Sequence, residues 1–354
     1  MKFNFLNCNF LSQDDIKKLY YNNIQTVEQF LAHADLEIMS KQTNVQLKTL
    51  KQAKKFIMGQ YSPFPEFGNV LIEKCLKKIF VIKTGCSQID AMISGGIYSS
   101  EITEITGPTS TGKTQICFNL IANMLDQYEN FNCLYIDSNR DFCFKRLIQL
   151  IEFRLDKKLK KNDSIKSKNI LDLAKQVKVV DCHNIFHLLV ILFQIKKVNL
   201  NSDLNKKSAN SEDELSPNFL IIDNLSSLFN QFKVASSDIN FFLNHATNQL
   251  NYLANNMNMA IVVITQSNDY KAQYTYNSSS FTSTINFNCL YNSIWKNVPN
   301  LMVELKKINI SNEIEPCKNV LKFEIVKCKR PFIEDSSKRI CCFKIEDSGL
   351  TGTD

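Results

Sequence analysis

The chain has 354 residues, of which 44% are hydrophobic and 22% are charged. This length and balance exclude a disordered chain and predict one large globular domain with room for a small second one. The net charge of +7 is compatible with nucleic acid as a partner but does not require it. No apolar run is long enough to span a membrane, and the 12 cysteines form no CxxC pair, so we expect an intracellular protein with reduced thiols.

Residues 1–58 have the pattern of a small helical domain. Ser12 is followed three residues later by Asp15, which is a capping-box arrangement at the start of a helix. Apolar residues then recur at helical spacing, as at Val27 and Phe30. We therefore expect an all-helical N-terminal domain.

Residues 59–78 are expected to link this domain to the next, because proline and glycine are dense at their start. Tyr61 and Phe64 lie in this linker, where an exposed aromatic side chain is unusual. An aromatic side chain in a pocket is a typical interface anchor, so both are candidate partner-docking residues. The alternative, that both fold back onto the core of this chain, stays open.

From residue 79 to residue 354, β-rich runs alternate with helical stretches, which predicts an α/β domain with a mainly parallel sheet. Strands are expected at 101–106, 133–138, 177–182, 218–223 and 259–265. Later runs lack intervening helices and are expected to close the sheet with antiparallel strands, at 301–308, 320–328 and 339–347.

A motif of the form GxxxxGK[ST] follows the first of these strands and precedes a helical run. It consists of Gly107, Pro108, Thr109, Ser110, Thr111, Gly112, Lys113 and Thr114. Glycine lets backbone amides curl around phosphates, and the lysine reaches the β and γ oxygens. The Thr114 hydroxyl is the type of ligand that completes magnesium coordination. The motif predicts binding of ATP with Mg²⁺.

Two strand ends carry polar residues that bear on this site. The strand 218–223 ends in Asp223, which we expect to hold the magnesium shell together with Thr114. The strand 133–138 contains Asp137 and is followed by Asn139. Asn139 stands where a general base is expected, and an amide can orient water but cannot accept its proton. We therefore assign no catalytic residue.

Residues 267–293 form a long polar stretch with aromatic residues spaced along it. Spaced aromatics suit stacking on single-stranded bases, and Tyr270, Lys271 and Tyr274 are the candidate DNA-binding residues. A loop of this length is either functional or disordered, and both possibilities stay open.

Taken together, these features resemble the RecA-type recombinases, and among them most closely the eukaryotic D-type paralogues of the recombinase Rad-fifty-one. The resemblance covers nearly the whole chain. It rests on residues 26–31, 34–37, 60–65, 84–90, 96–106, 112–115 and 134–139. It implies a RecA-like P-loop ATPase core preceded by a small helical domain.

The resemblance also implies a nuclear role in DNA repair by homologous recombination. Such paralogues assemble with sibling paralogues (the B-type, the C-type and the X-ray-repair paralogue) and assist the recombinase filament on single-stranded DNA. Recombinases carry glutamate where this chain has Asn139, which implies weak ATP hydrolysis. Met302 replaces an expected arginine, and the residues flanking Pro331 differ from the proline turn that caps a neighbouring subunit's ATP.

Two other functions stay open at this point. In the first, the chain is a competent DNA-dependent ATPase that performs strand exchange itself. In the second, it is a purely structural subunit with static nucleotide. Asn139 argues against the first alternative, and the intact Lys113 and Thr114 argue against the second.

Overall fold

The computed structural model describes residues 10–33, 35–61, 65, 67–159, 170–204, 217–230, 236–267, 294–308, 320–330 and 339–353. The chain forms two compact units, Met1–Cys75 and Leu76–Asp354. The helix α5 (Gly68–Lys78) runs across the boundary between them.

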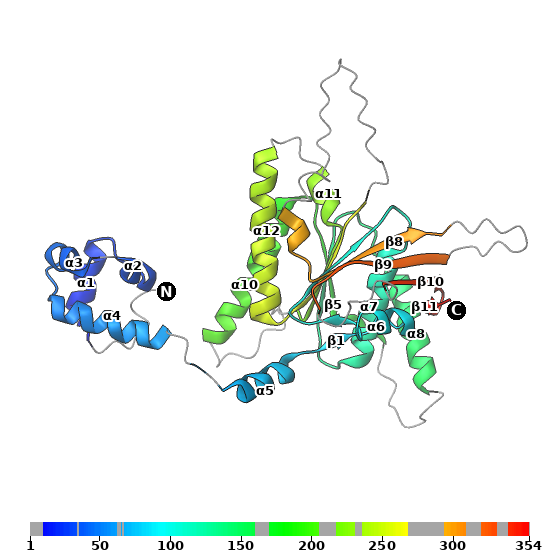
Figure 1. Ribbon diagram of the computed structural model, residues 1–354, viewed down its shortest axis with the longest axis horizontal. Helices are drawn as coiled ribbons and strands as arrows, with labels where there is room; N and C mark the ends of the chain where they lie inside the picture. Colours follow the sequence, from blue (N-terminus) through cyan, green and yellow to red (C-terminus); the bar gives the residue numbers. More distant parts are fainter. Residues whose placement is uncertain are drawn as a thin grey trace, which may run out of the picture. The chain divides into compact units, whose positions relative to one another are not determined.

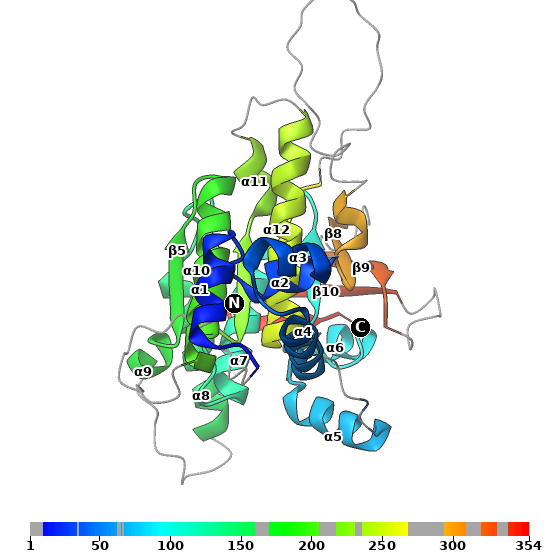
Figure 2. The ribbon, with the colours of Figure 1, turned by 90° about the vertical axis from the view of Figure 1, so that its left-hand side faces the viewer.

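The first unit is helical throughout its described residues (blue in Figures 1 and 2). Its helices are α1 (Gln13–Tyr21), α2 (Val27–Ala32), α3 (Leu36–Thr43) and α4 (Leu47–Tyr61). The N–H of Asp15 donates to Ser12 Oγ at 3.1 Å, and the N–H of Ser12 donates to Asp15 Oδ2 at 3.2 Å, so the capping box forms. Side chains from all four helices meet in one buried cluster, which includes Leu19, Phe30, Met39, Leu50 and Ile57.

Much of the stretch predicted as a linker, 59–78, is helical, because α4 continues to Tyr61 and α5 covers Gly68–Lys78. The side chains of α5 are exposed, including the large apolar ones of Ile72 and Leu76. The candidate docking residue Phe64 lies outside the described residues, and only the backbone of Tyr61 is described.

Within the described residues, the second unit is built on a nine-stranded sheet in the order β11-β10-β9-β8-β3-β7-β6-β4-β5. The strands β3 to β8 run parallel, and β9, β10 and β11 continue the sheet in antiparallel fashion. Their bounds are β3 Ile102–Thr106, β4 Cys133–Asp137, β5 Val177–Asp181, β6 Phe219–Asp223, β7 Ala260–Ile264, β8 Leu301–Lys307, β9 Val320–Cys328, β10 Ile340–Glu346 and β11 Gly349–Gly352. A separate two-stranded antiparallel sheet pairs β1 (Val81–Ile82) with β2 (Ile97–Tyr98).

Helices cover both faces of this sheet (Figures 1 and 2). On one face lie α7 (Lys113–Gln127) and α8 (Phe144–Leu159), and on the other lie α10 (Ile185–Leu204) and α12 (Ser236–Met257). The remaining short helices are α6 (Ser87–Met92), α9 (Ile170–Ala174), α11 (Leu225–Asn230) and the 3₁₀ turn η2 (Trp295–Asn297).

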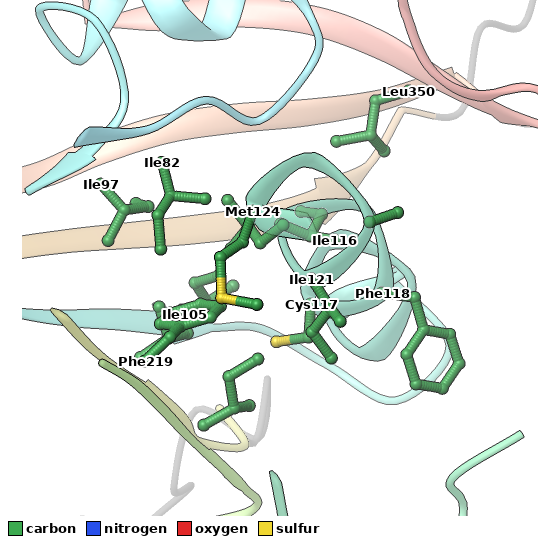
Figure 3. Packing of buried hydrophobic residues seen from close by; sticks show 14 of the residues in the cluster. Ile82, Ile97, Ile105, Ile116, Cys117, Phe118, Ile121, Met124, Phe219 and Leu350 are labelled. Carbon is green, nitrogen blue, oxygen red and sulfur yellow. The ribbon is translucent and has the colours of Figure 1, made fainter. Parts of the chain in front are cut away.

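The strand β6 illustrates why these runs are apolar throughout. Phe219 and Ile221 pack toward α7, whereas Leu220 and Ile222 pack toward α10 and α12. Because successive strand residues point to opposite faces and both faces are covered, residues 219 to 222 are all apolar, and the acid Asp223 stands only at the strand end. Figure 3 shows Met124 of α7 close to Phe219 on the sheet.

The fold confirms the predicted α/β core with a helical N-terminal region, and it differs from the sequence prediction at two strands. The strand β8 was expected to be antiparallel, but it pairs in parallel with β3 and is antiparallel only to β9. The prediction rested on the lack of a helical sequence pattern between the runs, but a parallel pairing requires only a connection of a dozen or more residues. The strand β11 was not predicted. Among the described helices, none is both long and apolar enough to cross a membrane.

Candidate nucleotide-binding site

The predicted phosphate loop joins β3 to α7, as the motif requires. Gly107 has φ of 156° and Gly112 has φ of 81°, values that favour glycine. A Cβ atom on Gly107 would lie 2.6 Å from the carbonyl oxygen of Leu305, and one on Gly112 would collide with the side chain of Ile345. The two motif glycines are therefore needed for loop geometry and for close packing against β8 and β10.

Lys113 opens α7 and is largely buried, with 9% of its side chain exposed. Its Nζ donates to the carbonyl oxygens of Gly107 at 2.8 Å and Pro108 at 2.5 Å, so the ammonium lies under the loop. Burial lowers the pKa of Lys113, and the nearby charge of Asp223 acts in the opposite direction. A bound phosphate group would place an anion directly beside this cation.

Asp223 ends β6 beside the loop and is buried, with 5% exposure. Thr114 Oγ1 donates to Asp223 Oδ2 at 2.7 Å, so the structure brings together the two predicted magnesium residues. The Tyr135 hydroxyl donates to the same oxygen at 2.6 Å. Burial raises the pKa of Asp223, and the hydrogen bonds from Thr114 and Tyr135 act in the opposite direction.

A cavity of about 570 Å³ opens beside the loop. It is lined on one side by Ser110 to Gln115 and on the other by Lys307, Ile308, Val320, Leu321 and Ile345. The cavity combines a cationic loop with an apolar wall, which fits the phosphates and the base of a nucleotide. Lys113 and the loop amides would hold the phosphates, and Thr114 with Asp223 would hold Mg²⁺, which neutralises phosphate charge when bound.

The carboxylate of Asp137 is not available as a general base. It accepts the backbone N–H groups of Asn139 at 3.1 Å, Arg140 at 2.9 Å, Asp141 at 3.3 Å and Phe142 at 2.8 Å. Asp137 is buried and holds the turn that follows β4. Asn139 lies in that turn with an exposed side chain, so the turn presents an amide where the base was expected.

A family model described as Rad51 matches residues 76–286, which is more than half of the chain. The chain belongs to the Rad51 family. The matched span includes the phosphate loop, Asn139 and Asp223. The fold described above is the RecA-like fold of this family.

Several known proteins are similar to this Rad51-family chain. DNA repair protein RAD51 homolog 4 of Mus musculus is 30% identical over 189 residues, covering 53% of this chain and 54% of the mouse protein. Probable DNA repair protein RAD51 homolog 4 of Dictyostelium discoideum is 29% identical over 205 residues, covering 52% and 57%. The DNA repair protein XRCC3 homolog of Arabidopsis thaliana is 28% identical over 231 residues, covering 62% and 70%. The similarity thus spans little more than half the length of the first two relatives.

The candidate DNA-binding residues lie outside the described residues; they are Tyr270, Lys271 and Tyr274. Pro331 also lies outside the described residues. Trp295, which follows the long polar stretch, is fully buried. Met302, which replaces the expected arginine, is half-buried on β8.

Sequence reasoning missed two polar residues near the site, Tyr135 and Glu104. Glu104 lies in the middle of β3 with no solvent exposure. Its carboxylate accepts the Thr265 hydroxyl at 2.6 Å and the Trp295 indole N–H at 2.9 Å. The signal for Glu104 in the sequence was one acidic residue inside a strand-like run. The sequence alone does not show whether such a residue faces the core or the solvent.

We expect the stability of the protein to fall as pH rises from 6 to 8. Burial raises the pKa of Glu104 from its ordinary 4.5 to about 7, while the hydrogen bonds and the charge of Lys327 act in the opposite direction. Between pH 4.5 and 7 the folded state therefore keeps a proton on Glu104 that the unfolded state has released. The stabilisation that comes from this proton is lost as the pH rises through 7. Between pH 6 and pH 8 the loss amounts to about 1.4 kcal/mol of unfolding free energy.

Denaturant unfolding at pH 6, 7 and 8 measures this loss. Glu104→Gln is the matched variant, because it keeps the size of the side chain and removes its titration. The variant should lose less stability than the wild type over the same range. Equal pH dependence in the two proteins would show that Glu104 does not titrate there.

Proposed function

We propose that this chain is an ATP-binding recombinase paralogue in DNA repair by homologous recombination. It assembles with sibling paralogues and assists the recombinase filament on single-stranded DNA, and it hydrolyses ATP weakly. The observation that carries the proposal is the pairing of an intact phosphate site with an amide at the general-base position. Lys113, Thr114 and Asp223 equip the chain to hold ATP with Mg²⁺, whereas Asn139 provides no proton acceptor.

The names of the relatives support the repair context, since the mouse, Dictyostelium and Arabidopsis proteins are all called DNA repair proteins. We place the chain in the nucleus on the same ground. The partners we propose are the B-type, C-type and X-ray-repair paralogues. Tyr270, Lys271 and Tyr274 are the proposed contacts to single-stranded DNA, because aromatic stacking with a cation suits unpaired bases.

In the same proposal, residues 1–58 form the helical domain, 59–78 the linker and 79–354 the ATP-binding core. Tyr61 and Phe64 of the linker anchor the chain to a sibling paralogue. The recombinases carry a small residue where this chain has Phe64, so a pocket shaped for that small residue disfavours docking of this chain. The chain therefore pairs with a sibling in preference to a copy of itself.

Replacing both Tyr61 and Phe64 with alanine should weaken partner binding by at least about 2 kcal/mol, the typical cost of truncating interface hot spots. ATP binding should not change. The measurement is the capture of the purified C-type and X-ray-repair paralogues by the tagged chain, with and without ATP, together with a melting curve.

Tyr21→Ala is the matched control, because Tyr21 is an aromatic residue of α1 that is 88% exposed. It should leave both capture and melting temperature unchanged. If the double variant captures partners normally but melts earlier, the two aromatics stabilise the chain's own core and the docking proposal fails. If the wild-type chain captures neither paralogue, the assembly role itself is wrong.

A further inference from the structure

The Tyr135 side chain reaches from the middle of β4 to the end of the neighbouring strand β6. In the register of β4 and β6, Tyr135 pairs with Ile221 and Asp137 pairs with Asp223. Tyr135 therefore lies two residues before the paired acids and on the same face of the sheet. Its ring runs along the strand direction, so that the hydroxyl reaches Asp223 Oδ2 at 2.6 Å.

Aromatic contacts hold this ring in place. Its centroid is 6.1 Å from that of Phe118 and 4.7 Å from that of Phe142, the latter in edge-to-face geometry. Phe118 follows Thr114 by four residues on α7, so both lie on the same face of that helix. One helix face thus presents the Thr114 hydroxyl to Asp223 Oδ2 and fixes the ring whose hydroxyl donates to the same oxygen.

Hydrogen-bond donors surround the two paired carboxylates. Asp137 lies opposite it in register, and two carboxylates side by side in a buried site repel each other. Asp137 is compensated by four backbone N–H groups of the turn that follows β4. Asp223 receives hydroxyl hydrogen bonds from Thr114 and Tyr135, and the Thr114 oxygen is also the predicted magnesium ligand.

We propose that Tyr135 is a positioning residue for magnesium: its hydroxyl holds the Asp223 carboxylate in the orientation in which Asp223 and Thr114 receive a nucleotide-bound divalent cation. The proposal rests on the proposed ATP–Mg²⁺ binding of this site. Tyr135 does not touch the nucleotide or the metal itself. Its role is to fix the orientation of one carboxylate by a hydrogen bond to a charged group.

The test is the binding of a fluorescent ATP analogue to the full chain over a series of Mg²⁺ concentrations and in excess EDTA. In Tyr135→Phe, the Mg²⁺ concentration that gives half of the magnesium-dependent gain in affinity should rise about tenfold. This is the factor typical of losing one hydrogen bond to a charged group. Affinity for the analogue in EDTA should match that of the wild type, because the phosphate contacts of Lys113 and the loop are unchanged.

Tyr128→Phe is the matched control. The Tyr128 hydroxyl is also hydrogen-bonded, but to the backbone of β1 rather than to Asp223: it accepts the N–H of Val81 at 3.1 Å and donates to the carbonyl oxygen of Val81 at 3.0 Å. This variant should melt earlier and keep the wild-type Mg²⁺ dependence. If Tyr135→Phe behaves in the same way, Tyr135 is merely structural and the inference is overturned.

Two further outcomes are decided by the same experiment. If the wild-type chain binds the analogue equally well in Mg²⁺ and in EDTA, the proposed ATP–Mg²⁺ function fails before Tyr135 is in question. Should Tyr135→Phe not fold, Phe118→Leu keeps the hydroxyl and loosens the ring. It must raise the required Mg²⁺ concentration in the same direction, and an unchanged value would overturn the inference.

Discussion

ATP turnover by the purified chain should be about 10² to 10⁴ times slower than that of a recombinase with glutamate in place of Asn139, because general-base assistance typically contributes that factor. Asp137 and Asp223 do not replace it. Asp137 is held by four backbone N–H groups, and Asp223 is held by Thr114 and Tyr135. Turnover should stay low when single-stranded DNA is added.

Phosphate release by the wild type, Asn139→Glu and Asn139→Gln measures this effect. The glutamate variant restores a proton acceptor on an exposed side chain and should raise turnover at least about tenfold, a conservative share of general-base assistance. The glutamine variant has the same length without a carboxylate and should remain slow. Brisk DNA-stimulated turnover by the wild type would instead favour a competent ATPase that exchanges strands itself.

Replacing Lys113 with alanine should weaken ATP binding about tenfold to a hundredfold. The ammonium lies under the phosphate loop, where its Nζ contacts the carbonyl oxygens of Gly107 and Pro108. Losing a hydrogen bond to a charged phosphate costs about 1.5–3 kcal/mol, and each 1.4 kcal/mol is a factor of ten in affinity. The fold should survive, because alanine is the best helix former at this first position of α7.

Titration with a fluorescent ATP analogue in Mg²⁺ gives the two affinities. Lys145→Ala is the control, since Lys145 is an exposed lysine of α8 and its loss removes the same charge from elsewhere on the chain. It should bind like the wild type. Wild-type affinity in Lys113→Ala, with an unchanged melting temperature, would mean that the loop does not bind the phosphates.

The strands and the phosphate loop could be predicted because their signals are local. The predicted run 133–138 became Cys133–Asp137, a buried apolar run that ends at an acid. The run 320–328 became Val320–Cys328, in which apolar residues alternate with charged ones. The capping box is likewise local, since it joins Ser12 to Asp15 three residues later, and it formed as predicted. The loop motif fixes its own spacing, so Lys113 and Thr114 were found directly.

Contacts between residues distant in sequence were beyond the same reasoning. Tyr135 meets Asp223 across 88 positions, and Trp295 meets Glu104 across 191. A tyrosine in an apolar strand looks like an ordinary core residue until the register of the neighbouring strand is known. The direction of β8 escaped prediction for a related reason, because pairing depends on where a long connection returns the chain.

The nucleotide that the purified chain retains tests the central claim most directly. The chain would be incubated with ATP and Mg²⁺, freed of unbound nucleotide by rapid desalting, denatured, and analysed chromatographically for ATP and ADP over several hours. We predict that the wild type retains nucleotide, that Lys113→Ala retains little, and that the retained nucleotide stays predominantly ATP. A wild-type chain that retains no nucleotide, or only ADP within minutes, would contradict an ATP-binding subunit with slow turnover.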